Sequence, residues 1–167
     1  MSYQRKIPLN PKELRKLIDL DKKDWENKQN TNCYAYALGL DVNIPKAFEP
    51  GEIGHSKTDL RNYNSFTYEL LLDNIFTDLE ALDIAYREID PIEEIAPDEW
   101  KIALFTTRNG EYIDDFHFMR EHKDGIWYHK NGTRIYNKTN LLFPIKNPKT
   151  VYLPGREYEK CLSLRLK

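Results

Sequence analysis

Apolar residues recur at helical spacing near the N-terminus and alternate with polar residues further along the chain. The segment 10–23 opens with Asn10, Pro11 and Glu13, a capping residue, a first-turn proline and a capping-box glutamate that together predict a helix. The segment 65–79 repeats apolar residues at the same period and predicts a second helix capped by Ser65. Between them, 45–64 is rich in turn formers and predicts a long loop that could border a cleft.

The second half of the chain predicts a series of strands. Alternating or β-branched runs lie at 85–89, 100–107, 112–122, 126–130, 133–136 and 150–153. In the last segment, Leu162, Leu164 and Leu166 alternate like the buried face of a terminal strand, and Cys161 points the other way. Helices followed by hairpin-linked strands favour an α+β domain. The length of 167 residues is that of a single domain, 1–167.

Residues 31–39 predict a short helix with Cys33 in its first turn. Asn30 or Thr31 can cap its free amides, and Gly39 is a natural stop. Because the N-terminus of a helix carries partial positive charge, we expect the pKa of Cys33 to fall below the free value of roughly 8.5. A buried cysteine that packs a helix on a sheet is the alternative. Tyr34 and Tyr36 on this helix are expected to be packing residues.

Two histidines lie on a predicted hairpin far downstream of Cys33. A three-residue loop, 123–125, with Gly125 in the left-handed conformation pairs Met119 with His129. In that register His117 and His129 share one face as diagonal neighbours, roughly 7 Å apart at the backbone. A two-residue loop would place them on opposite faces.

The cysteine and the histidines outline a catalytic triad. Cys33 would be the nucleophile, His117 the general base, and His129 the group that fixes the tautomer and tilt of His117. Asp115, two residues before His117, is the rival orienting group. No cofactor is needed for this chemistry.

These residues resemble a known family. A helix that begins with Asn-Cys, a strand that carries the base histidine and an adjacent strand that carries a polar third member resemble the papain-like fold, and the histidine third member is most similar to NlpC-type bacterial cysteine peptidases and amidases. The resemblance covers about residues 30–132. The chain differs from the family in having Asn32-Cys33-Tyr34 where Asp-Cys-Ser is usual.

The resemblance implies a cysteine helix packed on an antiparallel sheet and a hydrolase that cleaves an amide or related acyl bond in a peptide or other amide-containing substrate. It also implies that the backbone amide of Cys33 supplies one oxyanion donor. Asn32, Gln29 and Asn30 are candidates for the second donor, and loss of such a donor typically costs on the order of a hundredfold in rate.

Charge and hydropathy argue against several other classes. The formal net charge is -2 with both signs intermixed, so neither nucleic acid nor an anionic membrane is an expected partner. No run approaches the roughly 20 apolar residues of a membrane-spanning helix, and the N-terminus lacks the apolar core of a signal peptide. We therefore expect a protein that is cytoplasmic at synthesis, with export by a specialised route left open, as is its oligomeric state.

Three alternatives compete with the hydrolase. One is a non-catalytic phage or bacterial interaction protein that uses the same fold for binding. Another is a zinc site in which Cys33, His117 and His129 are the three ligands, although no CxxC or HExxH spacing supports it and we expect no metal. The third is a disulfide between Cys33 and Cys161, which would consume the nucleophile.

Overall fold

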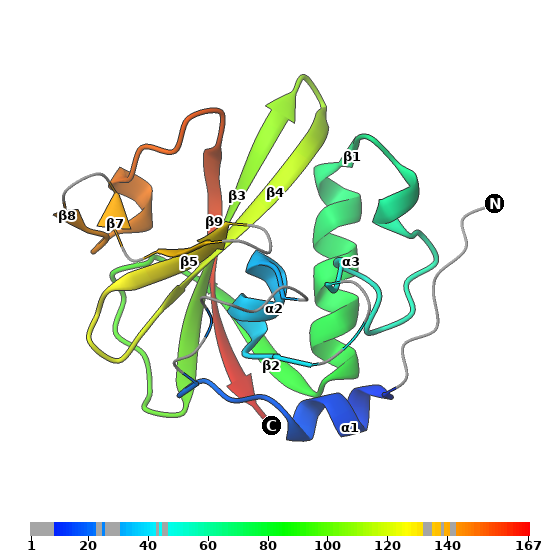
Figure 1. Ribbon diagram of the computed structural model, residues 1–167, viewed down its shortest axis with the longest axis horizontal. Helices are drawn as coiled ribbons and strands as arrows, with labels where there is room; N and C mark the ends of the chain where they lie inside the picture. Colours follow the sequence, from blue (N-terminus) through cyan, green and yellow to red (C-terminus); the bar gives the residue numbers. More distant parts are fainter. Residues whose placement is uncertain are drawn as a thin grey trace.

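The chain folds as a mixed α+β structure with a curled antiparallel sheet and few helices (Figure 1). The computed structural model describes residues 9–22, 25, 31–42, 44, 47–131, 135–137, 139–140 and 143–167. Every described strand pair is antiparallel. The predicted α+β class is confirmed.

The helices are shorter than the sequence pattern suggests. They are α1 (Pro11–Lys16), α2 (Cys33–Leu38) and α3 (Tyr68–Ala81), with 3-10 turns η1 (Leu60–Asn62) and η2 (Pro148–Thr150). The predicted capping box at Asn10 is present. The extension of this helix to residue 23 is wrong, because the chain turns after Leu17 and the Asp19 amide donates to Gly39 O. The predicted cap of the later helix is also wrong, since Thr67 caps α3.

Six strands run across the main sheet in the order β2-β9-β3-β4-β5-β6, and β1 pairs with the outer edge of β4. Their bounds are β1 Phe66–Thr67, β2 Ile84–Ile89, β3 Glu99–Asn109, β4 Tyr112–Glu121, β5 Trp127–Asn131, β6 Ile135–Asn137 and β9 Glu157–Leu166, and a separate pair joins β7 (Thr139–Asn140) to β8 (Phe143–Pro144). Residues 133 and 134 of one predicted strand lie outside the described residues. The strand predicted at 150–153 is wrong, because Pro148 starts η2 there under an Asn147 cap.

Each face of the sheet carries its own apolar cluster. On one face, Leu162 and Leu164 of β9 pack in the larger cluster with α2 and α3. On the other face, Cys161 packs with Phe105 and Met119 in a smaller cluster. Leu162 and Leu164 are buried as predicted, but Leu166 is 39% exposed. Both cysteines are free, and they pack in different clusters.

The loop that follows α2 is held by buried polar groups of α3. The Asp78 carboxylate accepts hydrogen bonds from Tyr34 Oη at 2.6 Å, from Gly51 N at 2.7 Å and from Gly54 N at 2.7 Å. Gly51 has φ of 100°, a conformation that favours glycine. These contacts fix the described part of the loop beside the N-terminal half of α2.

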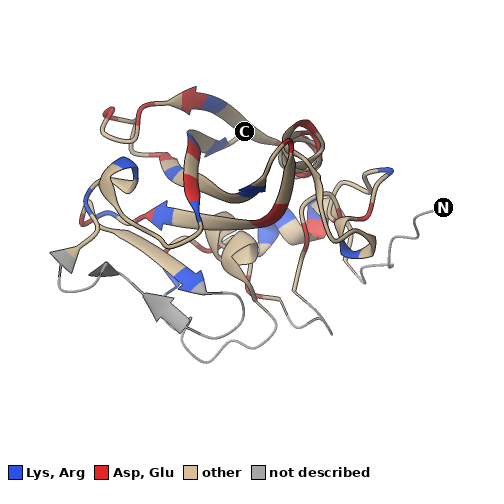
Figure 2. Cartoon of the chain, turned by 90° about the horizontal axis from the view of Figure 1, so that it is seen from above, with Lys and Arg blue, Asp and Glu red and all other residues tan. Residues whose placement is uncertain are grey.

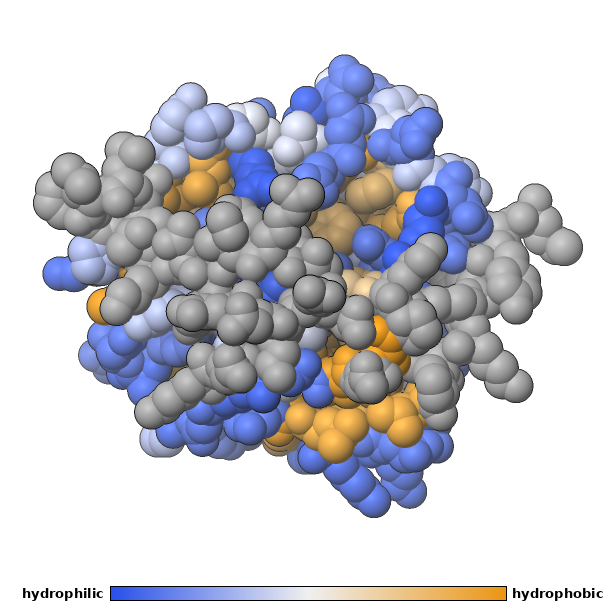
Figure 3. Space-filling model, viewed as in Figure 1, coloured by the Kyte–Doolittle hydropathy of each residue, from blue (hydrophilic) through white to orange (hydrophobic). Residues whose placement is uncertain are grey.

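Surface charge is distributed without a dominant sign. Figure 2 shows lysine and arginine interspersed with aspartate and glutamate over the described strands and helices. In Figure 3 the described surface is mostly hydrophilic, with an apolar area at the lower edge near α1, where Leu17 is 48% exposed. Within the described part of the chain, no helix has the length and apolar character needed to cross a bilayer.

Candidate active site

The hairpin of β4 and β5 has the register that its turn residues predict. Met119 pairs with His129, and Glu121 pairs with Trp127. The His122 amide donates to Ile126 O at 3.0 Å, which leaves 123–125 as the loop, and Gly125 has φ of 80°. The three-residue loop and the left-handed Gly125 are confirmed.

The two histidines of this hairpin form a buried pair. His117 Nε2 and His129 Nδ1 lie 2.9 Å apart, and the ring planes are nearly perpendicular at 89°. His117 is 1% exposed and His129 is 4% exposed. The prediction that these side chains share one face is confirmed. Because His117 Nε2 bonds to His129, a further partner of the His117 ring would have to bind its other nitrogen, Nδ1.

Cys33 is the first residue of α2. Asn32 caps the helix, since its Oδ1 accepts from Ala35 N at 2.9 Å. The predicted cap was Asn30, which lies outside the described residues, or Thr31. Gly39 ends the helix with φ of 72°, as predicted. Tyr34 and Tyr36 are both fully buried, which confirms that they are packing residues.

The start of α2 lies at a gap in the strand pairing along the edge of β4 that faces away from β3. On this edge β1 pairs with β4 at Tyr112 and Ile113, and β5 pairs with it from Met119 onward. Residues 114–118 have no strand partner there among the described pairings, and α2 contacts both β4 and β5. The backbone of Phe118 lies close enough to the Cys33 thiol to lower its pKa, against the larger effect of burial. The thiol is therefore adjacent to the residue that directly follows His117.

The thiol and the imidazoles approach this edge from different sides of the sheet. His117 lies opposite Phe105 in the β3–β4 register, and Phe105 belongs to the smaller cluster. Phe118 and Cys33 belong to the larger cluster. Because side chains alternate along a strand, any contact between the Cys33 thiol and the His117 ring must be made around the edge of β4.

Burial controls the protonation of all three groups. Removal from water raises the pKa of the Cys33 thiol to about 12, against a smaller opposing effect of the Phe118 backbone. The predicted lowering of this pKa is wrong, because a six-residue helix does not offset desolvation. Burial also lowers the pKa of His117 well below its ordinary value and that of His129 to about 4. All three groups are neutral near pH 7, so a resting thiolate-imidazolium pair is not favoured.

Arg156 is one of two charged residues near the site that sequence reasoning missed, the other being Glu49, whose charge raises the pKa of Cys33. The positive charge of the arginine lowers the pKa of His117, of His129 and of Cys33, in each case after the larger effect of burial. Arg156 precedes β9 and is far from the other site residues in sequence. No sequence signal could have found it, because its place follows from the pairing of β9 with β3.

The rival orienting group, Asp115, does not bond to the imidazole pair. Its carboxylate accepts from the Phe116 amide at 2.8 Å and lies 3.9 Å from Arg156, with 59% of the side chain exposed. The only described ring contact of His117 Nε2 is with His129. His129 is therefore the better placed of the two orienting candidates.

Asn32 has a structural task that competes with an oxyanion role. Its Nδ2 donates to Phe48 O at 2.7 Å, while its Oδ1 caps α2. The other oxyanion candidates, Gln29 and Asn30, lie outside the described residues. Within the described chain, no group of three or more His, Cys, Asp or Glu side chains is arranged to hold a metal ion. The zinc interpretation of Cys33, His117 and His129 therefore has no geometric support.

Comparison of the chain with protein-family models, with curated proteins and with solved structures gave no match in any of the three. The function is therefore argued from the residues and their geometry.

Proposed function

We propose that this chain is a papain-like cysteine hydrolase of the NlpC type that cleaves an amide or related acyl bond through Cys33, His117 and His129. The observation that carries the proposal is the His117–His129 hydrogen bond of 2.9 Å, in a hairpin where the backbone of the next residue, Phe118, lies close to the Cys33 thiol. Nucleophilic acyl transfer needs a thiol within reach of an oriented imidazole, and in this chain the His117 ring would reach the Cys33 sulfur around the edge of β4.

The neutral resting state defines how the nucleophile would be activated. With the proton of His117 on Nε2 and donated to His129 Nδ1, the Nδ1 atom of His117 accepts the thiol proton as sulfur attacks the carbonyl carbon. The same proton then passes to the leaving amine as the carbon–nitrogen bond breaks, which leaves an acyl thioester on Cys33. Water, deprotonated by His117, hydrolyses the thioester. Proton transfer and attack are coupled because a free thiolate is disfavoured by burial.

A non-catalytic binding protein with the same fold is the second candidate. The raised pKa of Cys33, about 12, equals that of Cys161, about 12, and Cys161 has no histidine partner among its described contacts. Cys33 is also only 5% exposed, so a substrate reaches it only if the covering side chains move. These features are typical of a cysteine that packs.

Acyl transfer from p-nitrophenyl acetate distinguishes the two candidates. We expect the wild-type chain and Cys161→Ala to release p-nitrophenol and to carry one acetyl group on Cys33, detected by mass spectrometry. Cys33→Ala and His117→Ala should lose roughly a thousandfold or more in rate, whereas His129→Ala should retain partial activity. Equal rates in wild type and Cys33→Ala, with no acetyl group on Cys33, would establish the binding protein instead. Unchanged circular dichroism of each variant is the control for folding.

A further inference from the structure

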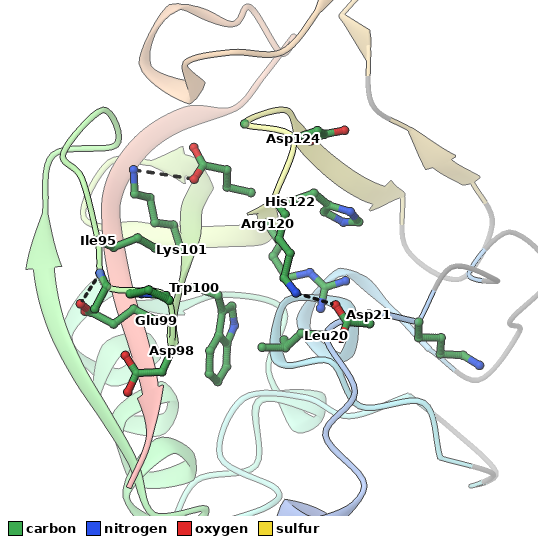
Figure 4. A pocket seen from close by; sticks show the side chains of 16 residues that line it. Leu20, Asp21, Ile95, Asp98, Glu99, Trp100, Lys101, Arg120, His122 and Asp124 are labelled. Carbon is green, nitrogen blue, oxygen red and sulfur yellow. Dashed lines mark hydrogen bonds and ion pairs between the residues drawn. The ribbon is translucent and has the colours of Figure 1, made fainter.

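A cavity of about 730 Å³ lies at the opposite end of α2 from Cys33. Its walls come from residues 20–22, from 95–98, from the start of β3 and from the end of β4 with its turn. Figure 4 shows the Trp100 indole between Asp98 and Glu99 on one side and Leu20, Asp21 and Arg120 on the other. The volume is in the range of small-molecule sites.

Arg120 and Lys101 are both buried cations in the lining of this cavity, but Lys101 is paired with Glu121. Arg120 is 1% exposed, yet within the described part of the chain its Nη1 and Nη2 atoms have no hydrogen-bond partner. The guanidinium carbon lies 4.4 Å from the Tyr36 ring centre and 5.8 Å from that of Trp25. These cation–π contacts engage the guanidinium plane and leave its N–H edge without an acceptor. A buried charge without a counterion is costly unless a ligand supplies one.

Three carboxylates around the cavity have partners other than Arg120. Glu121 lies 3.8 Å from Lys101. Asp21 lies 3.3 Å from Lys123 across the opening. Asp124 accepts from the Ile126 amide at 2.9 Å and from Tyr128 Oη at 3.1 Å. Arg120 forms no ion pair with a described residue, so the described part of the chain does not provide its counterion.

The cavity wall restricts the chemistry of a ligand. A guanidinium edge matches the two oxygens of a carboxylate or a phosphate. The acidic side chains at the rim disfavour a ligand with several negative charges. Trp100 and the apolar side chains of Leu20 and Ile95 provide a surface for an uncharged remainder. We propose that this cavity binds a small monocarboxylate whose carboxylate pairs with Arg120 and whose apolar or aromatic part lies along Trp100.

Calorimetric titration of the full chain with phenylacetate, acetate and inorganic phosphate tests the proposal. We expect one saturable phenylacetate site, weaker binding of acetate and still weaker binding of phosphate. Arg120→Met should weaken phenylacetate binding roughly tenfold or more, because a charge-assisted bidentate pair is lost. Arg120→Lys keeps the charge but not the fork and should also bind more weakly. Lys149→Met is the matched control, because Lys149 is a surface cation paired with Asp90 outside the cavity lining, and it should bind nearly as wild type does.

Several results would overturn the proposal. They are the absence of saturable phenylacetate binding by the wild type, equal affinity of the wild type and the Arg120 variants, or preference for phosphate. If neither Arg120 variant folds, wild-type crystals soaked with phenylacetate decide, because its carboxylate must lie within hydrogen-bond distance of Arg120. Density elsewhere, or none, contradicts the proposal. Cys33→Ala should bind phenylacetate as wild type does, so this test is independent of the proposed hydrolase activity.

Discussion

The two ends of α2 differ in how their polar groups are satisfied. At the N-terminal end the thiol and both imidazoles are buried and neutral, and the two imidazoles are hydrogen-bonded to each other. At the C-terminal end, near Gly39, the buried charge of Arg120 borders a cavity and has no hydrogen-bond partner in the described structure. The groups suited to covalent chemistry therefore lie where the protein is closed, and the unpaired charge lies where it is open.

Reactive residue types and binding space therefore do not coincide along this one helix. A six-residue helix separates the two regions. Because the N-terminal end is tightly paired, we expect substitutions there to act through lost hydrogen bonds. At the C-terminal end, we expect them to act through steric fit and charge.

The largest effect on stability is expected at Asp78, which holds the N-terminal end. Asp78→Ala leaves the Tyr34 hydroxyl and the amides of Gly51 and Gly54 without their acceptor. We expect the free energy of unfolding to fall by about 4 kcal/mol, because each orphaned buried donor costs about 1–3 kcal/mol and the loop can partly relax. Urea denaturation measures the change. Asp73→Ala, at an exposed position of the same helix, is the control, and an equal loss in both variants contradicts the prediction.

A smaller effect, dependent on pH, is expected from His129. Burial lowers its folded-state pKa to about 4, below the unfolded value of roughly 6.5. A depressed histidine pKa contributes stability that is present above the unfolded pKa and lost as pH falls through the folded pKa. The stability advantage of wild type over His129→Gln should therefore shrink by about 3 kcal/mol between pH 7 and pH 4.

His122 provides the matched comparison for this pH dependence. It lies at the C-terminal end of α2, bonds Tyr36 Oη, and burial lowers its pKa to about 4 as well. The stability advantage of wild type over His122→Gln, measured by denaturation at the same pH values, should also shrink as the pH falls from 7 to 4. If the free energies of unfolding of wild type and His129→Gln change with pH in parallel, His129 is not held neutral by burial.

Gly39 tests the steric fit of the C-terminal end. Its φ is 72°, and an added Cβ would lie 3.0 Å from Leu20 Cδ2 and 3.4 Å from Arg120 Nη1. We expect Gly39→Ala to lower the free energy of unfolding by about 2 kcal/mol, from backbone strain and crowding together. Gly155→Ala has the same strain at φ of 73° with nothing within 4 Å of the Cβ, and it should cost about 1 kcal/mol. Equal losses in thermal denaturation would show that Leu20 and Arg120 move aside freely.

The sequence predicted those parts of the fold that depend on local chemistry. The loop of Lys123, Asp124 and Gly125 defined the hairpin register, and the alternation around Cys161 defined its face. Local patterns did not place the end of α1, since the contact of Asp19 with Gly39 depends on the surrounding chain. The start of η2 does have a local signal, the Asn147 cap followed by Pro148, which the strand prediction overlooked.

The sequence predicted the residue types of the candidate site and the shared face of its two histidines. Cys33 could be found from the helix start, and the turn at 123–125 placed His129 on the same face as His117. The raised pKa of Cys33 could not be found, because desolvation depends on the packing of α2 against β4 and β5. Arg120 was missed for a related reason, since an arginine on a strand is expected to reach solvent.

The smallest effect is expected at Asn32, and it separates a capping role from a catalytic one. Asn32→Ala removes the acceptor for Ala35 N and the donor to Phe48 O, so we expect a loss of about 1 kcal/mol in unfolding free energy. Because the amide is directed at Phe48 O, acetylation of Cys33 by p-nitrophenyl acetate should change only a few-fold. Asn10→Ala removes the exposed cap of α1 and is the matched control for stability. A drop on the order of a hundredfold in Asn32→Ala acylation, with the fold intact, would instead assign Asn32 to the oxyanion hole.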